Sequence, residues 1–132
     1  MGSRELASED WVSFFNAFSR QYRNRPVTVE VSDPDNPARS LAIGHNLPLD
    51  GIVVEFFGGR AQSIEIILGE SIDNRVVHIV SHPRKITIGQ ISNGQDEIVV
   101  IDSSTDPQAR IDFRSPPLQA AALRANSITI NP

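Results

Sequence analysis

The stretch Leu47–Leu68 constrains the fold most, because it contains two runs of β-branched and aromatic residues joined by Gly58 and Gly59. Runs of this kind predict β-strands, and paired glycines permit a tight turn with positive φ between them. From Ile52 to Phe57, the residues on both faces of the first strand are mostly apolar. We therefore expect this strand to be covered on both faces.

An amphipathic helix is predicted at residues 8–23, ahead of the first strand. Ser8 is a good N-cap residue, and the acidic residues that follow it would face the positive end of the helix dipole. Aromatic residues recur at helical spacing along one face, namely Trp11, Phe14, Phe15, Phe18 and Tyr22. We expect this aromatic face to pack on the open side of the sheet and to cover the second face of the strand that begins at Ile52. The alternative is an exposed face that binds a second copy or another protein.

The β body is predicted at residues 27–113, because short apolar runs alternate there with turn-forming residues. The further strands are expected at 27–31, 41–43, 75–80, 85–91, 97–102 and 109–113, with a loop at 32–40 and a turn or bulge at Gly44-His45-Asn46. The pattern lacks the strand–helix alternation that is typical of parallel sheets. We predict a mainly β (α+β) fold, in which the helix packs on an antiparallel meander sheet or on a small SH3-like or Sm-like β-barrel of about six strands.

Residues 1–132 are expected to form a single domain, since domains commonly contain roughly 100–150 residues. The tail at residues 114–132 is predicted to contain a helical turn and a short strand. Such a tail would either close an edge of the sheet or reach across to a second subunit. The apolar residues predicted to form that interface are Leu118, Leu123, Ile128 and Ile130.

Several segments occur in an order that suggests a family. They are Trp11-x-x-Phe14-Phe15-x-x-Phe18-Ser19, Val27–Val31, Leu47–Ile52, Ile66–Gly69, His78 with Pro83, and Phe113–Pro116. In this order the chain resembles a bacterial family of small uncharacterised domains, in which an aromatic helix precedes an all-β body. The family has no assigned activity, so the resemblance implies the extent of the domain and no catalytic residue.

The composition excludes several classes of function. The chain has no cysteine, which excludes a disulfide framework, thiolate metal sites and a cysteine nucleophile. Its net charge of −4 and its scattered cations make nucleic-acid binding an unfavourable hypothesis. No run approaches the ~20 apolar residues of a membrane span, and the N-terminus lacks the apolar core of a signal peptide. We expect a cytoplasmic protein with no cofactor and no membrane partner.

The sequence offers little catalytic or metal-binding chemistry. His78 and His82 are four residues apart, which on a strand corresponds to roughly 13 Å, too far for both to bind one ion. No metal site is therefore predicted there. The chain also lacks a nucleophile-elbow motif, and Gly58-Gly59-Arg60 lacks the spacing of a phosphate-binding loop. No catalytic residue is predicted.

The segment from His82 to Lys85 is the locally basic part of the chain. Residues of this segment and of the preceding strand could bind a phosphate, an RNA or an acidic partner. The predicted ligand-binding residues are His78, His82, Arg84, Lys85 and Arg75. The alternative interpretation is a solvated turn.

Three functional hypotheses follow. The leading hypothesis is a non-enzymatic β domain that acts as a protein-interaction or ligand-binding module and self-associates, so that its partner is itself or another protein. The second is an Sm-like barrel that binds RNA or a nucleotide, by analogy with the layout of that fold, although the acidic charge and the lack of exposed strand aromatics oppose it. The third is a small enzyme with a cleft around His78 and His82, or around Asp50.

Overall fold

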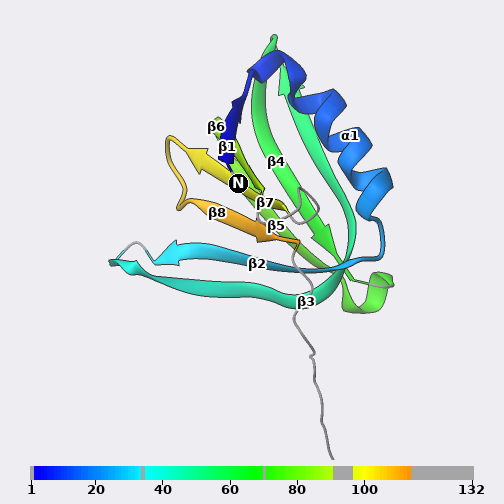
Figure 1. Cartoon of the computed structure of the whole chain (residues 1–132). Coiled ribbons are helices and arrows are strands. Elements are labelled where there is room, and N and C mark those ends of the chain that lie inside the picture. Colours follow the sequence, from blue (N-terminus) through cyan, green and yellow to red (C-terminus); the bar gives the residue numbers. More distant parts are fainter. Residues whose placement is uncertain (1, 34, 70, 91–96, 114–132) are drawn as a thin grey trace, which may run out of the picture.

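The computed structural model describes residues 2–33, 35–69, 71–90 and 97–113. In chain order the elements are β1 (Gly2–Leu6), the short 3₁₀ helix η1 (Ser8–Asp10), α1 (Trp11–Tyr22), β2 (Pro26–Asp33), β3 (Asn36–Phe57), β4 (Arg60–Leu68), the 3₁₀ helix η2 (Ile72–Asn74), β5 (Val76–Ser81), β6 (Pro83–Gln90), β7 (Glu97–Ser103) and β8 (Ala109–Asp112) (Figure 1). The prediction of a mainly β fold with an N-terminal helix is therefore confirmed.

All the described strands belong to one eight-stranded sheet with the order β1-β6-β7-β8-β2-β3-β4-β5. The order contains two antiparallel meanders, β2 to β5 and β6 to β8, which are joined where β8 pairs with β2. The strand β3 has 22 residues and serves both parts of the sheet, since its first half pairs with β2 and its second half with β4. The sheet has eight strands where a sheet or barrel of about six was predicted, and β1, which was not expected, pairs with β6.

The core lies between the curled sheet and α1, which runs along β3 (Figure 1). The helix buries Trp11, Phe15, Phe18 and Tyr22, as their helical spacing predicts. The ring of Phe18 meets that of Phe113, directly after β8, edge to face at a centroid distance of 4.4 Å. Aromatic pairs of this kind stabilise a core by about 0.5–1.5 kcal/mol beyond the area that they bury. The aromatic face of α1 therefore holds the helix on the sheet.

The prediction that Ser8 caps the helix is wrong. Residues 8–10 form η1, α1 begins at Trp11, and the Ser8 side chain makes no hydrogen bond within the described chain. The N–H of Asp10 donates instead to the carbonyl of Ala7 at 2.9 Å. The tighter 3₁₀ pattern thus satisfies the backbone of the first turn without a side-chain cap.

The predicted loop at 32–40 is wrong in its extent, because β3 already begins at Asn36 and pairs with β2 from there. The turn or bulge expected around Gly44 is a bulge inside β3. The β2–β3 register shifts in this region, and Asn46 takes a φ of 57°. A bulge of this kind bends a strand and increases its twist without ending it, so one long strand stands where shorter strands were predicted.

The helix does not cover the second face of β3, contrary to the prediction. The Ser19 hydroxyl accepts the N–H of Ile52 at 2.9 Å and lies 3.4 Å from the carbonyl of the same residue, to which it donates. The helix therefore covers the backbone edge of β3 on the side away from β4, while its aromatic face turns to the core. As a result, Val53 and Phe57 on the second face stay exposed.

The tail at residues 114–132 lies outside the described part of the chain, and the predicted interface residues Leu118, Leu123, Ile128 and Ile130 lie there too. Its predicted helical turn and strand stay predictions. Among the described residues, no helix has the length and apolar character needed to cross a membrane.

Candidate functional site

The first candidate site is the sheet face that α1 leaves open. Register makes Val53, Glu65 and Ile79 cross-strand neighbours on β3, β4 and β5, and it likewise pairs Ile67 with Val77. The apolar side chains that point away from the core on these strands are called the outer face; they are Val53, Phe57, Ile67, Val77 and Ile79. Phe57 is 77% exposed, and Val53, Val77 and Ile79 are 43%, 48% and 49% exposed. Apolar side chains gathered on one surface mark interaction sites more often than isolated ones do.

The strand β5 ends the sheet, and within the described residues no strand pairs with its free edge. The N–H of Ser81 points to this edge and donates to the Asp106 carboxylate at 2.7 Å, and the Ser103 hydroxyl donates to the Ser81 carbonyl. Because the hydrogen bonds of an antiparallel pair alternate along each strand, the N–H groups of Val77 and Ile79 point to the same edge. Side chains thus close one end of the edge, and within the part of the chain that the structure describes the backbone of Val77 and Ile79 remains open to a further strand.

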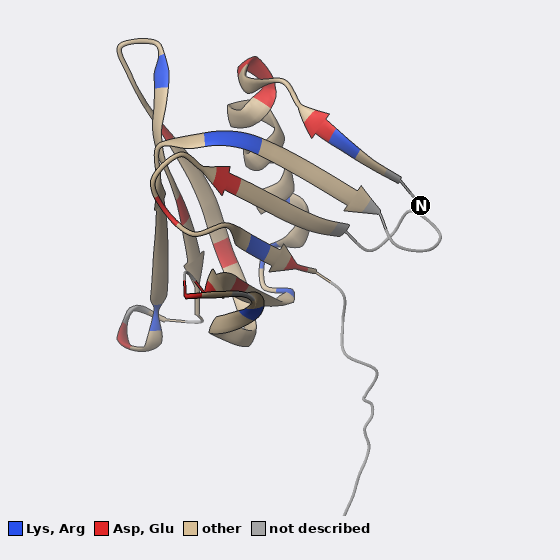
Figure 2. Ribbon diagram, turned by 90° about the vertical axis from the view of Figure 1, so that its left-hand side faces the viewer, with Lys and Arg blue, Asp and Glu red and all other residues tan. Residues whose placement is uncertain are grey.

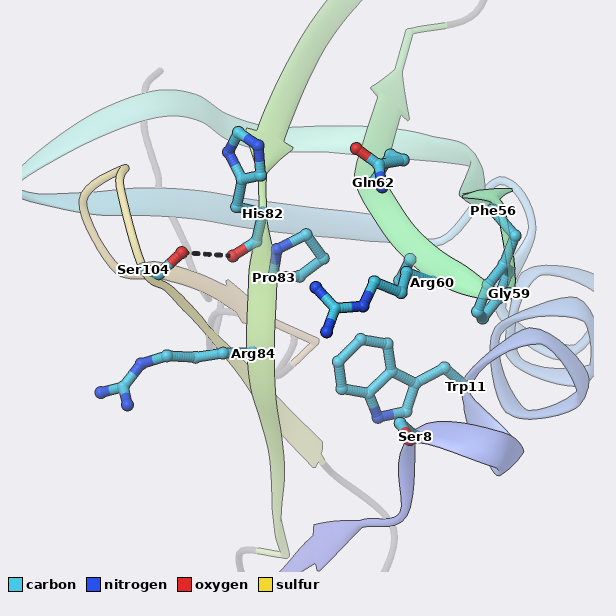
Figure 3. A pocket seen from close by; sticks show the side chains of 11 residues that line it. Ser8, Trp11, Phe56, Gly59, Arg60, Gln62, His82, Pro83, Arg84 and Ser104 are labelled. Atoms are coloured by element: carbon cyan, nitrogen blue, oxygen red, sulfur yellow. Dashed lines mark hydrogen bonds between the residues drawn. The ribbon is translucent and has the colours of Figure 1, made fainter.

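The second candidate site is a hollow of about 540 Å³ at the corner where β5 passes into β6 (Figure 3). The β3–β4 hairpin contributes Arg60 and Gln62, the corner contributes His82 and Arg84, and Trp11 from the start of α1 forms part of the wall. The volume falls in the range of small-molecule sites, roughly 300–1,000 Å³. Two of the predicted ligand-binding residues, His82 and Arg84, therefore meet in one hollow.

The other predicted ligand-binding residues lie elsewhere. Arg75 forms an ion pair with Asp50, with 3.4 Å between Nη2 and Oδ2. Lys85 is exposed on β6, and His78 is half-buried on β5; neither lines the hollow. The cleft expected in the enzyme hypothesis therefore contains His82 without His78, and Asp50 does not line it either.

The two histidines differ in their surroundings. Burial lowers the pKa of His78 below its ordinary value of 6.5, and the nearby Asp106 carboxylate opposes this shift. His82 is exposed, and its Nδ1 lies 3.3 Å from the Thr105 hydroxyl. In the described parts of the chain, no three His, Asp or Glu side chains are grouped as the ligands of a metal ion would be.

Sequence reasoning missed Arg60 and the outer face. Arg60 follows Gly58 and Gly59, whose φ angles of 62° and 79° confirm the predicted positive-φ turn. A cation directly after a two-glycine hairpin turn is the signal that could have identified it. The outer face was missed because its apolar residues on β3 were assigned to a contact with the helix.

Comparison with known proteins gives one family. Residues 2–121 match the model of a family described as a family of unknown function (DUF5335). Searches of curated proteins and of solved structures gave no match. The resemblance to a family without an assigned activity is thereby confirmed, whereas its bacterial source stays a prediction.

Proposed function

Because the chain belongs to the DUF5335 family, a family of unknown function, we propose a function from its geometry: it is an interaction domain that self-associates by pairing the β5 strands of two copies. One observation carries the proposal. At Val77 and Ile79, exposed apolar side chains coincide with N–H groups that point to a free sheet edge. Addition of a strand to such an edge is a common mode of protein recognition.

Two β5 strands can pair antiparallel about a two-fold axis at His78. In this register Val77 of one copy lies opposite Ile79 of the other, and the two residues exchange both of their N–H···O=C bonds. The same surface is used by both copies, so the assembly closes at two subunits. Each strand thus supplies the donors and acceptors that the other leaves open.

The same register joins the outer faces of the two copies. The side chains of Val77 and Ile79 become cross-strand neighbours across the axis, and β-branched pairs of this kind contribute roughly 0.2–1 kcal/mol each. Where the two sheets join, the strand order is β3-β4-β5-β5-β4-β3. Its outer surface then carries the apolar side chains of both copies around the axis, with Glu65 of each copy between Val53 and Ile79.

Charge complementarity favours a second copy as the occupant. In the proposed register Arg75 lies opposite Ser81 of the second copy, whose N–H is bonded by the Asp106 carboxylate. Arg75, whose guanidinium pairs with Asp50 within its own chain, thus places a cation near Asp106 of the second copy at each end of the strand pair. Opposite charges placed in this way fix the register of an interface more than they raise its affinity.

Sedimentation velocity over a roughly hundredfold range of protein concentration tests the proposal, because a dimer forms by mass action. We expect the wild-type chain to shift from monomer to dimer as the concentration rises. The variant Ile79→Lys should remain a monomer, since a charged residue on an edge strand opposes strand pairing. The matched control is Val12→Lys, which places the same charge at a 39% exposed apolar residue of α1 and should leave the dimer intact.

Circular dichroism and thermal unfolding establish that both variants keep the fold. A wild-type chain that stays monomeric over the whole range contradicts the proposal, and so does an Ile79→Lys variant that associates like the wild type. A dimer that is lost in Val12→Lys and kept in Ile79→Lys would place the interface on the helix, the alternative raised by the sequence.

A further inference from the structure

The hollow at the β5–β6 corner carries positive charge that no acidic lining residue neutralises. Arg60 and Arg84 line it, and the described lining contains no Asp or Glu. Neither guanidinium forms an ion pair within the described chain, whereas Arg23, Arg39 and Arg75 each lie within 4.0 Å of a carboxylate. Figure 2 shows the basic positions at the hairpin between β3 and β4 and at the start of β6.

The guanidinium of Arg60 occupies the centre of the hollow. In Figure 3 its guanidinium lies between Pro83 and Trp11 and points into the hollow, while the Arg84 side chain points away from that centre. Phe56 adds a partly exposed aromatic ring to the lining. A guanidinium presents a planar fork of donors that matches carboxylate and phosphate oxygens. The centre thus combines an oxyanion-binding group with apolar neighbours.

The backbone of the corner is held in place. His82 takes a φ of 52°, in the left-handed region that few residues other than glycine adopt. Its N–H donates to the Gln62 carbonyl at 2.9 Å, and its own carbonyl accepts the N–H of Ser104 at 3.1 Å. These bonds connect the corner to β4 on one side and to the segment after β7 on the other. The parts of the lining at Gln62, His82 and Ser104 are therefore joined by backbone hydrogen bonds.

We propose that this hollow binds a small ligand that carries an oxyanion, a phosphate or a carboxylate, on a flat apolar group. Arg60 binds the oxyanion in bidentate fashion, and Arg84 adds long-range attraction from the rim. The apolar part lies against the exposed ring of Phe56, beside the largely buried side chains of Trp11 and Pro83. The indole N–H donates to the Leu6 carbonyl at 3.2 Å, so Trp11 contributes its ring surface and not a donor. This site lies next to the Ser81 end of the β5 edge, but its lining contains none of the β5 residues that pair in the proposed dimer.

Titration with phenyl phosphate, benzoate and phenol at constant ionic strength tests the proposal. Binding is followed by the fluorescence of Trp11, the single tryptophan of the chain, and by the NMR signal of the Arg60 Nε–H group. We expect saturable binding of one or both anions, with phenyl phosphate and benzoate distinguishing the two oxyanion sources. Phenol, which lacks the charge, should bind at least about tenfold more weakly.

Variants assign the binding to the hollow. Arg60→Gln should weaken anion binding at least about tenfold and Arg84→Gln by less, since a charge-assisted bidentate contact is stronger than attraction at a distance. The control Arg110→Gln removes an exposed arginine of β8 that does not line this hollow and should have no effect. The proposal is overturned if Arg60→Gln binds the anions as the wild type does, if phenol binds equally well, or if no ligand saturates. The same titration on monomeric Ile79→Lys keeps this outcome independent of self-association.

Discussion

The two ends of the sheet, β1 and β5, are edge strands of opposite character. On β1 the residues Ser3, Arg4 and Glu5 are exposed, and two of the three are charged. On β5 the exposed side chains are those of Val77 and Ile79. Charged residues on an edge prevent another strand from pairing with it, whereas exposed β-branched residues favour pairing. The difference indicates which end of the sheet is open to a partner.

The second half of β3 provides a third kind of edge. There α1 covers the strand, and the Ser19 hydroxyl bonds both the N–H and the carbonyl of Ile52. The sheet thus protects one edge by charge and another by a helix. Within the described residues, the free edge of β5 has hydrogen bonds only at its Ser81 end, from Asp106 and Ser103.

Blocking the open edge should have the largest effect. The variant Val77→Pro removes the N–H that points to the free edge and leaves the bonds between β5 and β4 intact, as proline is tolerated on an edge strand. Each copy loses one intersubunit donor, at about 0.5–1.5 kcal/mol for each bond. We expect dimerisation to weaken by about tenfold or more in sedimentation equilibrium. The control Val77→Thr keeps the donor and the side-chain shape, and equal weakening by both variants would contradict the backbone pairing.

Removing the side chain that protects the β3 edge should have the next largest effect. This effect is on the stability of the fold and not on dimerisation. The variant Ser19→Ala leaves the partly buried N–H of Ile52 without its partner, which we expect to lower the free energy of unfolding by about 1–3 kcal/mol. Denaturant unfolding measures this change. Ser13→Ala on the exposed side of α1 is the control, expected to change the value by less than about 0.5 kcal/mol. Equal stability of Ser19→Ala and the wild type would show that the helix does not protect this edge.

Removing the proposed charge contact should weaken the dimer slightly. We expect Arg75→Gln to raise the dissociation constant by a few fold, about 0.2–1 kcal/mol, and to reduce its salt dependence. Arg23→Gln is the control, since Arg23 also pairs with Asp50, at 3.6 Å, but lies at the end of α1. A change of the same size in both variants would assign the effect to Asp50 within one chain and would contradict the proposed register.

The smallest expected effect concerns pH and His78. Burial lowers the pKa of His78 in the folded state below 6.5, so the unfolded chain binds its proton more readily than the folded chain does. The contribution of neutral His78 to the free energy of unfolding is therefore complete above pH 6.5. It is lost as the pH falls below that value toward the pKa of His78 in the folded state. Unfolding of the monomeric variant Ile79→Lys at pH 7.5 and 5.5, with and without His78→Gln, measures this loss. The free energy of unfolding should decrease less between pH 7.5 and 5.5 in the chain with His78→Gln. An equal decrease with and without this substitution would contradict the assignment of the pH effect to His78.

Local patterns predicted most of the fold. The aromatic spacing from Trp11 to Tyr22 identified the helix and its buried face, and β-branched runs identified most of the strands. The long β3 was divided in prediction because Gly44 and Asn46 are typical turn residues, yet here they form a bulge that pairing with β2 stabilises. β1 was missed because its short polar sequence becomes a strand only through its pairing with β6.

The candidate sites depended on tertiary structure. Apolar residues on both faces of β3 indicate burial equally well by a helix, by a second sheet or by another molecule, so the sequence could not show that Val53 and Phe57 are exposed. The basic segment at His82 and Arg84 was predicted as a ligand site, but its partner Arg60 comes from a distant hairpin. Only the fold brings these cations together.

Amide hydrogen exchange of β5 tests self-association most directly. We expect the N–H groups of Val77 and Ile79 to be protected at concentrations at which the chain is a dimer and to lose that protection on dilution. Those of His78 and Val80, which alternate with them and point to β4, should be protected at every concentration. Rapid exchange of Val77 and Ile79 in a dimeric sample would contradict the account. Protection that does not change on dilution would also contradict it, because the edge would then be paired within one chain.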